Sequence, residues 1–151
     1  MVLVKKKLGI AILLILIIVY GVSISGKKGS TENAIITAEK SEKFKTTEIE
    51  TAIARVKKEF KGFTNCEMTK LYYNEEKSNV EINHYLTENR ENKSVKNADK
   101  KDFIVLYSDF EVGEENDQNS GFIPGSNHKA WMWLLKKDKF WKKWEVVTSR
   151  V

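Results

Sequence analysis

The sequence predicts an α+β domain that follows an apolar N-terminal segment, and three observations support this fold class. The chain begins with a long uncharged apolar run, two later stretches repeat apolar residues with helical spacing, and several stretches are strand-like. The expected order is a helix, a strand, a second helix and then three strands, the last two forming a hairpin. This order favours two helices with a curved antiparallel sheet of about four strands.

The apolar run covers residues 8–24 and follows three lysines, Lys5, Lys6 and Lys7. A helix of this length spans ~26 Å, slightly less than the ~30 Å hydrocarbon core of a bilayer. The lysines are expected to stay in the cytoplasm, which puts the rest of the chain outside it. We therefore interpret residues 1–25 as a transmembrane signal-anchor or signal peptide, with one pass through the cell membrane at residues 8–24.

Two outcomes stay open for this segment. Ser23 and Ser25 stand at the positions that a signal peptidase reads, so cleavage before Gly26 would release a secreted protein. The apolar run is longer than the usual 7 to 15 residues of a signal-peptide core, which favours a retained anchor.

The outer part begins with a polar stretch, residues 26–45, which we interpret as a linker. The extracytoplasmic α+β domain is then expected over residues 46–151. Apolar residues at helical spacing predict a first helix over 48–61, with a capping box at Thr47 and Glu50. A strand is expected over 63–74, and a second capping box at Ser78 and Glu81 predicts a helix over 79–90.

Three more strands are expected over 102–112, 129–135 and 144–149, and the first two are apolar on both faces. Phe103, Val105 and Tyr107 share one face of their strand. If that face continues into the face of Trp131, Trp133 and Leu135, the six residues form one large apolar area. We predict that one sheet face packs on the first helix and the other lines a concave pocket or a homodimer contact centred on Trp131 or Trp133. The predicted binding residues are Phe103, Tyr107, Trp131 and Trp133.

The charge distribution argues against a nucleic-acid partner. The net charge is +5, but the first 31 residues hold five lysines and no acid, while the remaining 120 hold 21 basic and 21 acidic residues. A nucleic-acid binder needs its excess positive charge on the folded domain. Cys66 is the only cysteine, so the fold has no intramolecular disulfide and depends on its core.

No pattern of catalytic or metal-ligating residues is complete. His84 and His128 lack a third ligand at metal-site spacing, so we predict no metal and no cofactor. The series Asp117-x-Asn119-x-Gly121 resembles part of a calcium loop, but a further ligand and a closing Glu are missing, which favours a solvated loop. Asp109 and Tyr107 could act together in an enzyme, although a strand-end role for Asp109 is favoured.

All four tryptophans lie between Trp131 and Trp144, among five lysines. Such a strip could stack nucleic-acid bases, or its rings could line a glycan or peptide surface. Core packing is the favoured interpretation, because large aromatic residues dominate cores as readily as interfaces.

Several segments resemble a family of short exported proteins from Firmicutes, chiefly clostridia, known only as conserved uncharacterised domains. The segments are Phe60–Gly62, Cys66–Glu76, Ile104–Val112 and the strand Trp131-x-Trp133-x-Leu135. The resemblance covers about residues 44 to 147, although the end of the chain lacks the family's glycine-aromatic finish. The element order is also similar to the NTF2-like cone, an analogy of fold alone. The resemblance implies a fold and an exported location, and no activity.

Together these observations predict a membrane-tethered extracytoplasmic binding module that is not an enzyme. The expected partners are the membrane, a second copy of the chain, another protein or a small apolar ligand. The alternative is a small NTF2-like enzyme, of hydrolase or isomerase type, that uses a pocket in the cone.

Overall fold

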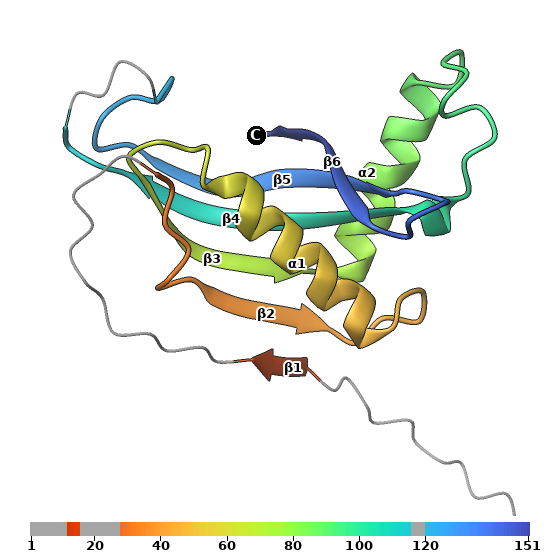
Figure 1. The fold of residues 1–151 in the computed structure, drawn as a ribbon, viewed down its shortest axis with the longest axis horizontal. Helices are drawn as coiled ribbons and strands as arrows, with labels where there is room; N and C mark the ends of the chain where they lie inside the picture. Colours follow the sequence, from red (N-terminus) through yellow and green to blue (C-terminus); the bar gives the residue numbers. More distant parts are fainter. Residues whose placement is uncertain (1–11, 16–27, 116–119) are drawn as a thin grey trace, which may run out of the picture.

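A mixed β-sheet with one helix on each face forms the folded part of the chain (Figure 1). The computed structural model describes residues 12–15, 28–115 and 120–151. The strands lie in chain order across a six-stranded sheet. They are β1 (Ile12–Ile15), β2 (Ile35–Glu39), β3 (Cys66–Tyr73), β4 (Phe103–Val112), β5 (Asn127–Lys137) and β6 (Trp144–Arg150). The helices are α1 (Thr46–Phe60), α2 (Glu75–Glu88) and the short 3-10 turn η1 (Lys100–Asp102). The fold is therefore α+β, as predicted.

The sheet is mixed rather than antiparallel, because β2 and β3 run parallel and the other pairs run antiparallel. Strand β2 lies inside the stretch expected to be a linker, residues 26–45, so that interpretation was wrong for β2. Only Ile36 and Ala38 of this strand face the core. Two inward residues are too few for a clear alternating pattern. A parallel partner also needs a long crossover, which α1 supplies.

Helix α1 buries the face that its spacing predicts. Its buried residues are Ile49, Ala52, Ile53, Val56 and Phe60. The helix begins earlier than expected, and Oε2 of Glu48 accepts the Lys45 backbone N–H at 2.9 Å. The expected capping box at Thr47 and Glu50 was therefore wrong in position.

Helix α2 also begins before its predicted start. Asn74 is the N-cap, and its Oδ1 accepts the Lys77 N–H at 2.8 Å. Ser78, expected as the cap, is fully buried inside the helix, where its Oγ accepts the Val105 N–H of β4 at 2.9 Å. This bond ties α2 to the sheet.

The predicted membrane segment lies almost wholly outside the described residues. Within it, only Ile12–Ile15 is described, as the strand β1 paired antiparallel with β2 and not as part of a helix. Among the residues that the structure describes, no helix is long and apolar enough to cross a membrane. The membrane anchor stays a prediction.

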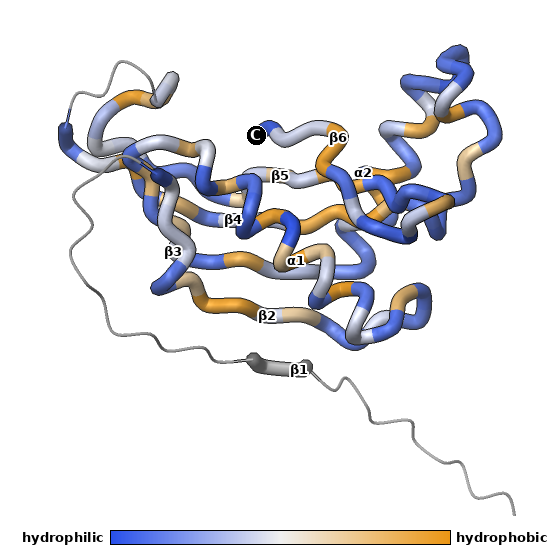
Figure 2. Tube along the Cα trace, viewed as in Figure 1, coloured by the Kyte–Doolittle hydropathy of each residue, from blue (hydrophilic) through white to orange (hydrophobic). Residues whose placement is uncertain are grey.

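Two apolar layers hold the helices against the sheet. The larger layer joins α1 to residues such as Ile104, Leu106 and Leu135, and the smaller joins Ile82 of α2 to Phe103, Val105 and Leu134. In Figure 2, β2 is coloured mainly apolar, whereas the loop after α2 is mainly hydrophilic. On the α2 side of the sheet, a groove lies beside the helix.

Candidate binding groove

The four predicted binding residues do not share a face of the sheet. Tyr107 pairs with Met132 and Leu106 pairs with Trp133 in the β4–β5 register. Residues opposite each other across a strand pair share a face. The face of Phe103 and Tyr107 therefore continues into Met132 and Leu134, under α2. Trp131 and Trp133 lie on the α1 face, so the single six-residue apolar area was wrong.

Trp133 is part of the core. Its side chain is fully buried, and its Nε1 donates to Oγ of the equally buried Ser108 at 2.8 Å. Trp131 is partly buried among other rings, with Phe110 at 5.5 Å and Phe122 at 5.7 Å between centroids. Neither residue lines a described cavity. The favoured interpretation of these two tryptophans as packing residues agrees with this geometry.

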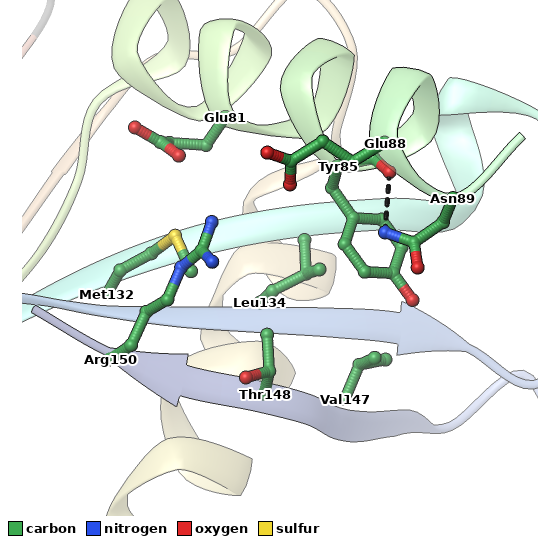
Figure 3. Close-up of a pocket in the computed structure, with 9 residues that line it drawn as sticks. All are labelled: Glu81, Tyr85, Glu88, Asn89, Met132, Leu134, Val147, Thr148 and Arg150. Atoms are coloured by element: carbon green, nitrogen blue, oxygen red, sulfur yellow. Dashed lines mark hydrogen bonds between the residues drawn. The ribbon is translucent and has the colours of Figure 1, made fainter.

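A groove lies between α2 and the outer strands β5 and β6, as Figure 3 shows. It consists of two adjoining cavities of about 260 Å³ and about 400 Å³. Both are lined by Glu81, Met132 and Arg150, so they form one continuous depression. Tyr107 lines the second cavity and is the predicted binding residue that reaches the groove.

The two sides of the groove present different chemistry (Figure 3). On the helix side, Glu81, Tyr85 and Glu88 are spaced as neighbours on one helical face, and the Tyr85 ring points toward the sheet. On the sheet side, Met132 and Leu134 lie beneath the groove and are only 6% and 1% exposed, so the apolar surface open to a ligand is mainly Val147 of β6, which is 41% exposed. Residues 80–89 of α2 span about 14 Å, the length of about four residues of extended chain.

The rim carries charges of both signs. Glu81 and Glu88 stand on α2, and Arg150 extends from β6 toward them. His84 lies beside Glu88, with Nδ1 at 3.4 Å from Oε1. The groove can therefore offer carboxylates to a cationic group and a guanidinium to an anionic one.

Tyr107 contributes a polar group at one end of the groove. Its hydroxyl donates to the Lys77 carbonyl at 3.4 Å. Burial, with the negative charge of Glu81 as a smaller cause, raises the pKa of Tyr107 to about 12. The hydroxyl therefore keeps its proton at neutral pH and serves as a hydrogen-bond donor.

The other candidate residues have structural partners or lie apart. Asp109 accepts the Ala130 N–H at 2.8 Å and lies 3.7 Å from Nζ of Lys129. His128 stacks on Phe110 of the α1 layer at 4.7 Å, far from His84 on α2. Among the described residues, no three His, Cys, Asp or Glu side chains gather as metal ligands would. Asp117 and Asn119 of the calcium-like series lie outside the described residues.

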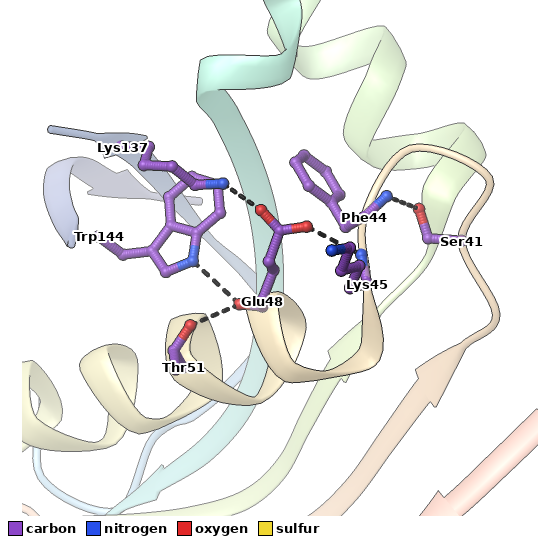
Figure 4. Close-up of polar contacts among 7 residues, drawn as sticks. All are labelled: Ser41, Phe44, Lys45, Glu48, Thr51, Lys137 and Trp144. Atoms are coloured by element: carbon purple, nitrogen blue, oxygen red, sulfur yellow. Dashed lines mark hydrogen bonds and ion pairs between the residues drawn. The ribbon is translucent and has the colours of Figure 1, made fainter. Parts of the chain in front are cut away.

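Apart from the groove, a polar cluster joins the start of α1 to the base of the β5–β6 hairpin (Figure 4). The Glu48 carboxylate accepts a hydrogen bond from Nζ of Lys137, and its backbone carbonyl accepts the Trp144 Nε1–H at 2.9 Å. The bond from Lys137 is the main cause that lowers the pKa of Glu48. Lys137 also lies 4.7 Å from the centroid of the Trp144 ring. These contacts fix the hairpin base.

The sequence analysis did not identify most of the residues that line the groove. Glu81, Tyr85 and Glu88 repeat at helical spacing, which was the available signal for a common face. Val147 and Arg150 gave no such signal, because only the fold shows that β6 lies opposite α2.

Comparisons with known proteins add no relative: no family model, no curated protein and no solved structure matches the chain. The clostridial family and the NTF2-like cone therefore stay predictions, and the groove has to be interpreted from its own chemistry.

Proposed function

We propose that the protein is a membrane-tethered extracytoplasmic binding module that holds a short extended peptide in the groove between α2 and β5–β6. The observation that carries this proposal is the pair of opposed groove walls. The exposed Val147 suits an aliphatic side chain, and the rim charges suit the polar groups of a peptide.

The length of the groove and the charges on its rim limit the class of ligand that it can bind. The helix wall matches about four residues of extended chain. Glu81 and Glu88 would attract a basic side chain, while Arg150 would attract a carboxylate. A peptide that combines apolar residues with one basic group and one carboxylate fits these three features together.

Two of the candidate catalytic groups, Tyr107 and Asp109, argue against the enzyme alternative, whereas His84 lines the same cavity as Tyr107. A general base needs a pKa near the working pH, and the Tyr107 pKa is about 12. Asp109 already accepts a backbone N–H and pairs with Lys129. Neither residue is available for proton transfer on a substrate in the groove.

The membrane location is supported by residues 8–24 and the three lysines before them. In a bilayer these residues would satisfy their backbone groups as a helix. Of these residues, Ile12–Ile15 pair with the edge of β2 as strand β1. The proposal thus requires that the β1 pairing be replaced by a helix when the segment enters the membrane.

Binding of a labelled probe peptide tests the proposal. The probe is Lys-Val-Ala-Val with a fluorophore at its amino end and a free carboxylate, and fluorescence polarisation follows its binding to the full chain. Arg150→Gln and Glu81→Gln should each weaken binding by up to about fivefold, since partly exposed charges contribute at most about 1 kcal/mol. The matched controls Arg90→Gln and Glu50→Gln, outside the groove, should leave it unchanged. Absence of binding, or equal loss in the controls, would contradict the proposal.

A further inference from the structure

The tip of the β5–β6 hairpin exposes two large aromatic rings that the core does not use. Phe140 is 81% exposed and Trp141 is 70% exposed, and their ring centroids lie 5.1 Å apart. Buried aromatic residues elsewhere account for the core on both sheet faces. An exposed apolar pair of this kind indicates an interaction surface.

Hydrogen bonds fix the conformation of the turn at the hairpin tip. The Asp138 carboxylate accepts the N–H groups of Phe140 at 2.9 Å and of Trp141 at 2.6 Å, while the Asp138 carbonyl accepts the Lys142 N–H at 2.8 Å. The contacts of Glu48 with Lys137 and Trp144 fix the hairpin base (Figure 4). The fold therefore holds both rings outward.

Positive charge surrounds the rings. Lys139, Lys142 and Lys143 stand in the same turn and are exposed. The segments that meet at this end of the sheet, residues 39–45, 74–77, 90–102 and 136–145, together carry 14 basic and 9 acidic side chains. The tip thus combines aromatic rings, which favour the membrane–water interface, with lysines, which favour anionic headgroups.

We propose that the hairpin tip is a membrane-contact site, in which Phe140 and Trp141 enter the interface of a bilayer and the neighbouring lysines pair with anionic lipid headgroups. The inference rests on the membrane location proposed above and is independent of the peptide groove. A soluble anionic polymer would satisfy the lysines but would give the two rings no apolar phase, so the lipid surface is the favoured occupant.

The position of the tip sets the orientation of the domain. Gly29 and Ser30, where the N-terminal segment joins the fold, bond to the Lys61 and Cys66 carbonyls at the opposite end of the sheet. Strand β4 has ten residues. Its length of about 34 Å separates the two ends. Contact at both ends would lay the sheet along the membrane, and the tether would make the second contact intramolecular.

Quenching of tryptophan fluorescence by brominated lipids tests the contact. The full chain and Trp141→Phe are compared in vesicles of phosphatidylcholine with and without phosphatidylglycerol, and flotation in a density gradient reports whether the chain is bound. In anionic vesicles the unmodified chain should be quenched more strongly than Trp141→Phe. The difference should disappear in neutral vesicles.

A charge reversal provides the second arm. Replacing Lys139, Lys142 and Lys143 by Glu should lower the equilibrium constant of the contact by at least about 100-fold, since each lysine near an anionic leaflet contributes about fivefold and each new glutamate adds repulsion. The matched control Lys57→Glu, Lys58→Glu and Lys61→Glu should keep the quenching difference.

The outcomes separate the two proposals. A chain that floats but shows no Trp141 quenching overturns the tip contact and leaves the anchor. Quenching of Trp141 only in anionic vesicles, with no flotation in neutral ones, supports the tip and overturns the anchor. A change in Trp141 fluorescence on addition of soluble polyphosphate, without a change on addition of vesicles, would assign the tip to an anionic polymer and overturn the lipid contact.

Discussion

The buried hydrogen bond between Trp133 and Ser108 allows a quantitative prediction about stability. Both side chains are fully buried, and the indole N–H has the Ser108 hydroxyl as its acceptor at 2.8 Å. Ser108→Ala removes the acceptor and leaves the indole N–H in an apolar layer. A buried polar group without a partner costs about 1 to 3 kcal/mol. We expect the free energy of unfolding to fall by about 2 kcal/mol, which corresponds to a decrease in Tm of roughly 4 to 8 °C for a chain of this length.

Urea denaturation followed by circular dichroism measures this loss on the full chain. Ser149→Ala is the matched control, because Ser149 pairs with Trp133 from β6 and is only partly buried. The control should stay within about 0.5 kcal/mol of the unmodified protein. Equal stability of Ser108→Ala and Ser149→Ala would refute the reasoning that Ser108 satisfies the indole.

Three further predictions concern the cap, the core and the topology. Glu48→Gln should destabilise the fold by about 0.5 to 1 kcal/mol above pH 5. Because the folded-state pKa of Glu48 is lowered from 4.5, this difference should shrink as the pH falls through that pKa, which urea denaturation at several pH values checks. Phe60→Ala, at a fully buried position of α1, should cost about 3 to 5 kcal/mol, and a loss below 1 kcal/mol would show that the α1 layer can collapse around it. External protease should remove the region after Gly26 from intact cells, and protection of that region would contradict the orientation; a soluble chain beginning at Gly26 would instead show cleavage.

The α+β class and the buried face of α1 could be predicted because apolar residues with a clear period determine both. Ile49, Ala52, Ile53, Val56 and Phe60 all lie in the core, as their spacing indicates. The strands β4 and β5 were also recognisable from their length and composition.

The mixed sheet could not be predicted, because β2 carries little signal of its own. Its inward residues, Ile36 and Ala38, are buried only because α1 brings the chain back to place β3 beside them. The parallel pairing is a property of the crossover and not of the strand sequence.

The candidate site depended on register, which the sequence left open. A shift of one residue exchanges the faces of a strand. The observed pairing of Ile104 with Leu135 puts Trp133 in the α1 layer, so this tryptophan, which had suggested a binding surface, belongs to the core. The groove itself joins side chains of α2 to side chains of β6, and only the tertiary fold brings these two segments together.

The central claim is that ligands bind between α2 and β6, on the face opposite Trp131 and Trp133. Amide and indole resonances of the ¹⁵N-labelled chain, titrated with the unlabelled probe Lys-Val-Ala-Val, test this most directly. We expect shifts for the amides of Glu81, Tyr85, Glu88, Thr148 and Arg150, with the indole N–H signals of Trp131 and Trp133 unmoved. Shifts of those two indole signals without shifts along α2 and β6 would contradict this claim and indicate that the ligand binds on the sheet face of Trp131 and Trp133.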